Sequence, residues 1–332
     1  MAQMKYFYEL TISSSPHAHS PVTTQTIMRD VLIALIPAML GSIYFFGFQS
    51  LLVTLVSAAA CVFFEWGFCK IRKLHCKTYD LSAVVTGVLL AFVCPVTIPY
   101  WTIILGDFFA IVLVKMLFGG LGKNIVNPAL AGRAFLFSWP VLMSNWVKVG
   151  FDNAAGLLST ADAVTAATPM SAMHQGALPE ESILDMFLGN IGGCIGETSA
   201  LLLIIGFIYL LYRKVITARI PLAYIGTVAI LAFLFPQGND RIAWMAAQVF
   251  GGGLMLGAIF MATDYVTSPL TKLGQIVYGI GCGIITILIR YFGGYSEGVT
   301  YAILCMNACS VLLDKIGRPV KFGAPKKEAA KK

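Results

Sequence analysis

Long apolar runs separated by short polar segments make up most of this 332-residue chain. An apolar run of about 18 residues or more can cross a bilayer as a helix. The runs lack the period-two alternation of the strands in a membrane barrel. We therefore predict an all-α polytopic membrane protein with about ten spans, at roughly 27–47, 50–69, 80–98, 100–118, 127–142, 194–212, 217–236, 242–263, 273–292 and 298–314.

Composition supports the same class. The chain is 58% hydrophobic and 12% charged, whereas a soluble domain carries about 25% charged residues. The net charge of +7 comes from Lys and Arg in the loops of one side, as the positive-inside rule describes. The basic residues therefore indicate a lipid bilayer as the surroundings and do not predict nucleic-acid binding.

The positions of the basic residues also predict an orientation. With the N-terminus in the cytoplasm, only Lys148, Arg241 and Arg290 of the 23 Lys and Arg fall outside. Both termini are then cytoplasmic, in the inner or cytoplasmic membrane, and residues 1–26 show no cleaved signal peptide. The predicted divisions are a cytoplasmic segment 1–26, a first membrane repeat 27–142, an outer loop 143–193, a second membrane repeat 194–316 and a basic cytoplasmic tail 317–332.

Two segments of the chain resemble each other. "GVLLAFVCPVTIP" (87–99) matches "GAIFMATDYVTSP" (257–269) at a constant offset of 170, with Pro99 aligned to Pro269. Five spans in each half give the halves opposite topology, the inverted-repeat plan of many transporters, whose sites form between the repeats on broken helices. Chance similarity between short apolar segments is the alternative.

Carboxylates inside or at the ends of apolar spans are candidate functional residues, because a charge in hydrocarbon is costly. Four are present: Glu65, Asp107, Glu197 and Asp264. Asp264 follows a predicted helix break and, with Glu65, is assigned to an ion or proton path, while Glu197 also fits the role of a partner for a helix dipole. The eight cysteines have no metal-ligand spacing, so no metal site is predicted.

A glycine-rich segment, "GGLGKNIVNPALAGRAF" (119–135), precedes another predicted helix. Asn127 followed by Pro128 is typical of a helix N-terminus. Close backbone approach at the glycines, with Lys123 and Arg133 nearby, suits an anionic or electron-rich ligand. A turn that only packs helices is the alternative.

The predicted outer loop contains "DAVTAATPM" (162–170). Small neighbours leave the hydroxyl of Thr168 accessible, but no nearby base activates it as a nucleophile. Modification by another enzyme needs only access, and an ordinary solvated loop threonine is the alternative.

The combination of this segment with "GGLGKN" and "NPALAGRAFLF" about thirty residues before it, and with "FMATD" (260–264) and "AILCMN" (302–307), resembles the RnfD family, the D subunits of Rnf electron-transport complexes. It also resembles the relative of that family, NqrB, the B subunit of the Na⁺-translocating NADH:quinone reductase. The resemblance covers about 25 to 320. It implies a urea-transporter-like fold and FMN held by a phosphoester on Thr168, attached by a flavin transferase. Thr165 and Ala166 replace the Ser and Gly that are commoner before that threonine.

The resemblance further implies a role in a larger membrane complex, with the A, B, C, E and G subunits of the Rnf complex as partners. Such a complex moves electrons between ferredoxin and NAD⁺ and couples them to Na⁺ or H⁺ translocation. A second flavin, riboflavin, is expected near Asn124, Asn127 and Arg133.

The chain alone is not predicted to be a complete enzyme. It has neither ferredoxin-type cysteine spacing nor a dinucleotide fingerprint, and no catalytic residue is assigned. The expected function is a flavin relay and ion path within the complex. An inverted-repeat channel or transporter for a small solute or ion, without flavin, is the alternative, and a purely structural subunit is a third possibility.

Overall fold

The computed structural model describes residues 22–73, 78–143, 146, 168–179, 181–238 and 240–317. Every regular element in these ranges is a helix, in agreement with the predicted all-α class. The elements are α1 (Thr24–Phe46), α2 (Phe48–Ile71), η1 (Thr78–Asp80), α3 (Ser82–Phe92), α4 (Tyr100–Phe108), η2 (Phe109–Met116), α5 (Pro128–Leu136), α6 (Pro140–Met143), α7 (Pro169–His174), α8 (Ile183–Leu188), α9 (Ala200–Tyr212), α10 (Arg219–Leu234), α11 (Arg241–Phe250), α12 (Leu254–Leu256), η4 (Gly257–Met261), α13 (Lys272–Phe292) and α14 (Val299–Leu313).

Local signals set the ends of the first long helices. Thr23 and Thr26 form a capping box at the start of α1, in which each side chain bonds the backbone of the other. α1 ends at Gly47, whose φ of 76° is favourable only for glycine. The helix α2 begins directly after this residue, so one glycine turns the chain between two long apolar helices.

Each of the ten predicted spans contains at least one helix, but the helices differ in length. By length and apolar composition, α1, α2 and α13 can each cross a membrane. A fourth candidate is α11 with the segment Leu254–Met261, bent by 59° at the break between them. Four shorter apolar helices of 10–17 residues are α3, α9, α10 and α14. Within the described ranges the helices are those of a membrane protein, several of them shorter than a full span.

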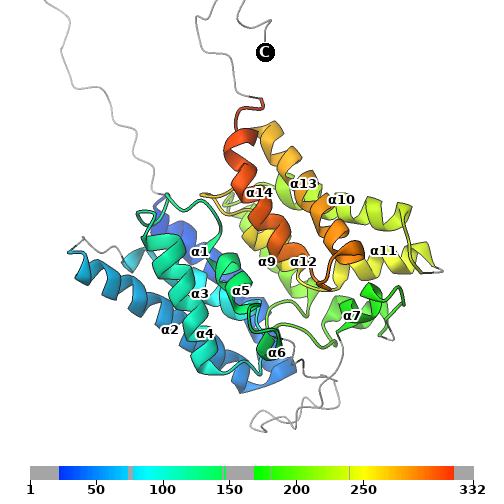
Figure 1. Ribbon diagram of the computed structural model, residues 1–332, viewed down its shortest axis with the longest axis horizontal. Coiled ribbons are helices and arrows are strands. Elements are labelled where there is room, and N and C mark those ends of the chain that lie inside the picture. Colours follow the sequence, from blue (N-terminus) through cyan, green and yellow to red (C-terminus); the bar gives the residue numbers. More distant parts are fainter. Residues whose placement is uncertain are drawn as a thin grey trace, which may run out of the picture.

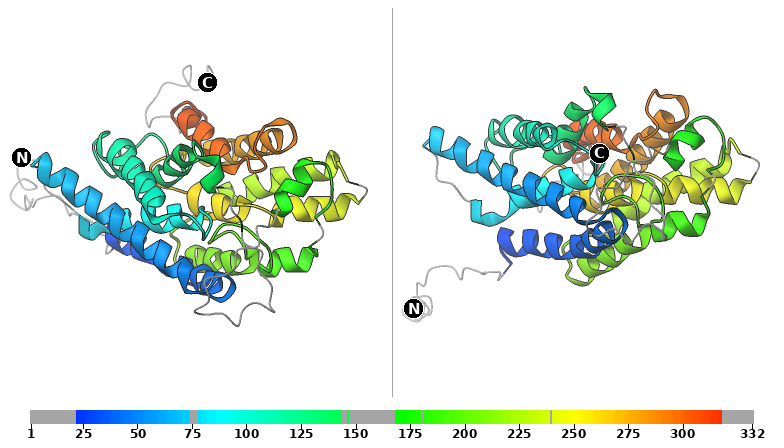
Figure 2. Two further views of the ribbon diagram at one scale, coloured as in Figure 1. Left: turned by 60° about the horizontal axis from the view of Figure 1, so that its bottom comes forward. Right: turned by 90° about the horizontal axis from the view of Figure 1, so that it is seen from below.

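The helices form two neighbouring groups (Figure 1). One contains α1 to α6 and the other α9 to α14. The groups meet where α1 packs against α9 and where α5 packs against α14. At the first contact a Cβ added to Gly206 of α9 would collide with the carbonyl oxygen of Ala34 in α1, so the backbones approach closely there, as small residues allow in membrane helices. Figure 2 shows the same two groups from two further directions.

The two similar sequence segments have similar local structure. In each, a helical stretch (to Phe92 and to Met261) is followed by irregular backbone that includes the aligned prolines. The first irregular segment also binds the other half of the chain. The amide N–H of Ile195 donates to the carbonyl of Cys94 at 3.1 Å, and that of Gly196 to the carbonyl of Phe92 at 2.9 Å. The non-helical backbone is therefore satisfied by protein, as burial in a membrane requires.

Candidate functional site

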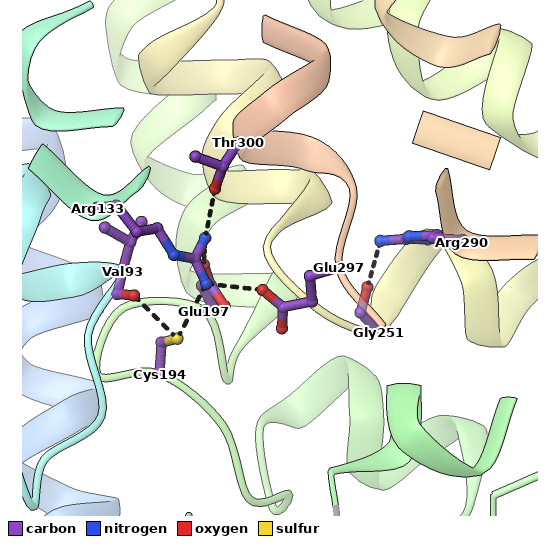
Figure 3. Close-up of polar contacts among 8 residues, drawn as sticks. All are labelled: Val93, Arg133, Cys194, Glu197, Gly251, Arg290, Glu297 and Thr300. Carbon is purple, nitrogen blue, oxygen red and sulfur yellow. Dashed lines mark hydrogen bonds and ion pairs between the residues drawn. The ribbon is translucent and has the colours of Figure 1, made fainter. Parts of the chain in front are cut away.

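A buried arginine binds two carboxylates where the two halves meet. Arg133 lies on α5 and is 1% exposed. Its Nη1 lies 3.1 Å from Oε1 of Glu197, and its Nη2 lies 2.7 Å from Oε2 of Glu297. Glu197 precedes α9, and Glu297 precedes α14. As Figure 3 shows, the guanidinium group lies between the two carboxylates, so the pairing joins α5 to the second half of the chain.

Neutral groups complete this Arg133 cluster. Arg133 also donates to Oγ1 of Thr300 at 3.2 Å and to Sγ of Cys194 at 3.5 Å (Figure 3). Oε2 of Glu197 and Nε of Arg133 have no hydrogen-bond partner among the described residues. A second buried cation, Arg290, interacts electrostatically with both carboxylates, so two cations offset the two carboxylates in a place where an unpaired charge is expensive.

Cys194, Glu197 and Glu297 offer ligand-type atoms within 4.8 Å of one another. Arg133 already bonds an oxygen of each carboxylate and the thiol sulfur. We therefore assign these residues to an ion-pair cluster rather than to a metal site.

Thr168 lies beside this cluster, in a small pocket that we name the Thr168 pocket. Its lining includes Gly192, Gly193, Glu197, Gly252 and Glu297. The threonine immediately precedes α7, but its side chain does not cap that helix. It is 6% exposed.

The expectation of an accessible hydroxyl at Thr168 is therefore wrong for the folded chain, because α7 packs inward and buries its own Met170 and Met173. Thr165, its predicted neighbour, lies outside the described residues.

The two asparagines predicted for a second flavin belong to a different pocket, which we name the inter-half pocket. Oδ1 of Asn127 accepts from the amides of Ala129 and Leu130 at 3.0 and 3.3 Å, the predicted N-cap of α5. Its Nδ2 donates to the carbonyl of Met261 in the other half at 3.2 Å. Asn124 and Asn127 line the pocket together with Lys115 and Asp264.

The residues that line the inter-half pocket do not include Arg133. The structure thus separates Arg133 from the two asparagines with which the sequence grouped it. Its donors face the Arg133 cluster, further along α5.

The carboxylates of the predicted ion path have unlike partners. Oε1 of Glu65 on α2 pairs with Nζ of Lys115 at 3.1 Å, and Nζ also donates to Oγ of Ser82 at 2.6 Å. Asp264 accepts from Oγ1 of Thr267 at 3.1 Å, as expected of its place beside a helix break. Lys115 and Asp264 line the same pocket, so the lysine connects the two predicted sites.

Two partners in these clusters were not predicted from the sequence. Glu297 pairs with an arginine 164 residues earlier in the chain, and no local pattern marks such a contact. Glu197 was considered as a dipole partner for the following helix, but that helix is capped by Ser199. A buried arginine in an apolar helix requires a counter-charge, and this requirement is the signal that could have indicated a carboxylate.

A comparison with protein families identifies the chain. The model of the NQR2, RnfD, RnfE family matches residues 11–323. The chain belongs to the NQR2, RnfD, RnfE family. The matched residues include both groups of helices, the Arg133 cluster and both pockets.

Curated relatives in this family cover nearly the same length. The chain is 45% identical to the D subunit of the Na(+)-translocating ferredoxin:NAD(+) oxidoreductase complex of Acetobacterium woodii, over 96% of each chain. It is 44% identical to the D subunit of the proton-translocating ferredoxin:NAD(+) oxidoreductase complex of Clostridium ljungdahlii, over 94% of this chain and 96% of the relative. The D subunit of the ion-translocating oxidoreductase complex of Actinobacillus succinogenes is 34% identical, over 93% of this chain and 96% of the relative.

Proposed function

We propose that this chain is the flavin-bearing membrane subunit RnfD of an Rnf-type ion-translocating ferredoxin:NAD⁺ oxidoreductase complex. The similarity to three complex subunits over more than nine-tenths of the chain supports this function. The chain works within the complex, since its sequence has no ferredoxin-type cysteines and no dinucleotide fingerprint. The A, B, C, E and G subunits of the complex are its proposed partners.

The observation that carries the flavin assignment is the surroundings of Thr168. Its hydroxyl is not used to cap α7, and three glycines, Gly192, Gly193 and Gly252, line its pocket. A Cβ added at Gly193 would have only Thr198 Cγ2 within 4 Å, at 3.7 Å, whereas one at Gly252 would lie 3.1 Å from Met170 Cγ and 3.3 Å from Arg290 Nη2. The missing side chain at Gly193 therefore suits the approach of a bulky group, while Gly252 is already packed against the protein.

The proposed group at Thr168 is FMN in phosphoester linkage, which supplies one- and two-electron transfer when bound. The residues of the chain position it and set its electrostatic surroundings. Glu197 and Glu297 contribute negative charge beside the pocket, and Arg133 holds one oxygen of each in place. Because Thr168 is buried, we propose that a flavin transferase modifies it before α7 packs.

The membrane topology completes the proposal. We propose ten spans in two inverted, urea-transporter-like repeats of five, with both termini in the cytoplasm of the cell and the Thr168 segment outside. The matching helix breaks after Phe92 and Met261 support the repeats. Asp264 and Glu65 provide the ion path, and Asn124 and Asn127 the inter-half pocket proposed for riboflavin.

The test is in-gel fluorescence of the denatured subunit under ultraviolet light. The chain is produced with its complex in a host that contains the flavin transferase. A fluorescent band that disappears in Thr168→Ala and remains in Thr165→Ala supports FMN on Thr168. A dark wild-type band refutes the flavin assignment and favours a channel or transporter for a small solute or ion.

A further inference from the structure

Another buried carboxyl group lies within the first group of helices, away from both pockets. Asp107 is on α4 and is 0% exposed. Its Oδ1 lies 2.7 Å from Oγ of Ser57 and 3.2 Å from Sγ of Cys61, both on α2. Its Oδ2 has no hydrogen-bond partner among the described residues.

The hydrogen bonds around Ser57 indicate where a proton lies. Oγ of Ser57 is 2.8 Å from the carbonyl oxygen of Gly87 on α3, as well as 2.7 Å from Asp107. A serine hydroxyl has one hydrogen to donate and can accept others. The single hydrogen of Ser57 is donated to the carbonyl of Gly87. The short contact between Ser57 and Asp107 is then a hydrogen bond only when Asp107 is protonated and donates from Oδ1 to Oγ of Ser57. Both distances are then ordinary O–H···O hydrogen bonds.

The charges around Asp107 favour the same state. The other titratable groups that interact electrostatically with Asp107 or Cys61 are Cys94, Lys115 and Glu65. Lys115 pairs with Glu65 and donates to Ser82. From α5, which packs on α4, the cation Arg133 pairs with Glu197 and Glu297. No ion pair is found for Asp107 in the described part of the chain, and an unpaired buried carboxylate becomes protonated instead of remaining charged.

We propose that Asp107, with Ser57 and Cys61, is a proton-binding site in the membrane domain. The two relatives at 45% and 44% identity carry Na⁺ and proton in their names, so overall similarity does not select the ion. A carboxyl group that donates to a hydroxyl, which in turn donates to a backbone carbonyl, holds H⁺. Its part in ion translocation rests on the proposed function, whereas its protonation does not.

The face of α2 that contains these residues leads to solvent. Ser57, Cys61 and Glu65 are four residues apart and therefore lie on one side of the helix. Glu65 also lines an open vestibule with Cys69, Asp80 and others at the same end of α2. Loading of the site transfers H⁺ from water in the vestibule through the carboxyl group of Glu65 to Asp107. The transfer forms an O–H bond on Asp107 and returns Glu65 to its ion pair.

Infrared spectroscopy of the purified complex tests the protonation state. The wild type should show a carbonyl-stretching band of a protonated carboxylic acid that is lost in Asp107→Asn and shifted in Ser57→Ala. Asparagine has the same shape and can donate to Ser57, so the variant should assemble. The matched control is Asp30→Asn, because Asp30 is ion-paired with Arg213 at 3.1 Å and should contribute no such band.

The result that overturns the protonated site is an unchanged acid band in Asp107→Asn. Neither spectrum depends on flavin. A dark gel band together with the Asp107 infrared band therefore rejects the proposed function alone, and a fluorescent gel band without the infrared band rejects the proton site alone.

Transfer of the complex into D₂O tests the access route, since deuteration shifts the band as the proton exchanges. The variant Glu65→Gln with Lys115→Met removes the carboxyl group and its partner together, so no buried charge is left unpaired. Exchange at Asp107 should be slower in this double variant than in wild type. Glu65→Asp, which keeps the carboxyl group, should exchange at close to the wild-type rate. Equal rates in wild type and the double variant would overturn the route through Glu65.

Discussion

Replacement of Arg133 by methionine should destabilise the folded chain strongly. The change removes the charge that pairs with Glu197 and Glu297, whose side chains are 3% and 12% exposed. Removal of one partner from a buried ion pair typically costs about 3–5 kcal/mol, because the remaining charge stays buried without compensation. The loss of the bond to Thr300 adds about 1 kcal/mol. We therefore expect a loss of roughly 4–6 kcal/mol, the sum of these two contributions.

The assay is equilibrium unfolding of the purified full chain in mixed micelles, followed by helical circular dichroism. Combining Arg133→Met with Glu197→Gln and Glu297→Gln removes all three charges and should recover most of the lost stability, because replacement of a whole buried ion cluster is often close to neutral. The matched control is Arg29→Met. Arg29 on α1 is exposed and forms no ion pair within the described residues, so its loss should cost about 0–1 kcal/mol.

Two results would refute this account of the Arg133 cluster. One is a loss in Arg133→Met no larger than that of the Arg29 control, which would mean that the two glutamates are neutral without their partner. The other is a triple variant as unstable as Arg133→Met, which would assign the loss to packing of the long side chain instead of to charge.

Three further predictions concern the ion path and helix packing. Asp264→Asn should retain flavin fluorescence and electron transfer but lose ion uptake in membrane vesicles, because a carboxylate is removed from the proposed path; an unchanged ratio of ions to electrons contradicts this. Lys115→Met removes a cation that competes for Glu65, so turnover should reach half-maximum at a lower concentration of the coupling cation, and a higher concentration contradicts it. Gly87→Ala should lower the free energy of unfolding by about 1–3 kcal/mol in the same assay, because its Cβ would lie 2.7 Å from the backbone of α2. Gly226→Ala is the control, since a Cβ there has nothing within 4 Å, and it should cause no such loss. Equal losses in the two variants contradict the packing argument.

The helical class was predictable because membrane helices are specified by local composition. A long apolar run fixes the existence of a helix, and Gly47 or the Asn127–Pro128 pair fixes an end. The lengths were less predictable. The span predicted at 80–98 becomes the 11-residue α3 followed by irregular backbone, because the chain there exchanges its helical bonds for bonds to Ile195 and Gly196. Such partners are distant in sequence and leave no local signal.

The candidate site was also predictable only in part. The sequence marked Thr168, Asp264 and Glu65 as unusual, since each polar group interrupts apolar or small residues. It predicted exposure of Thr168 from its neighbours, and this failed because burial depends on where α7 packs. The partner of Arg133 was missed because Glu297 precedes a helix of the other half. The residue types were readable from the sequence, while the pairs that they form required the fold.

The charges of the ion path cannot all be satisfied by the protein. Lys115 lies 3.1 Å from Glu65 and lines the same pocket as Asp264, yet one ammonium group neutralises only one carboxylate. Lys115 forms its ion pair with Glu65, whereas Asp264 accepts hydrogen bonds from the hydroxyl of Thr267 and the amide of Val266. Hydrogen bonds orient a carboxylate but do not cancel its charge. A cation that enters the inter-half pocket therefore finds Asp264 without an ion-pair partner among the residues that the structure describes. This makes Asp264 the stronger of the two candidates for ion binding.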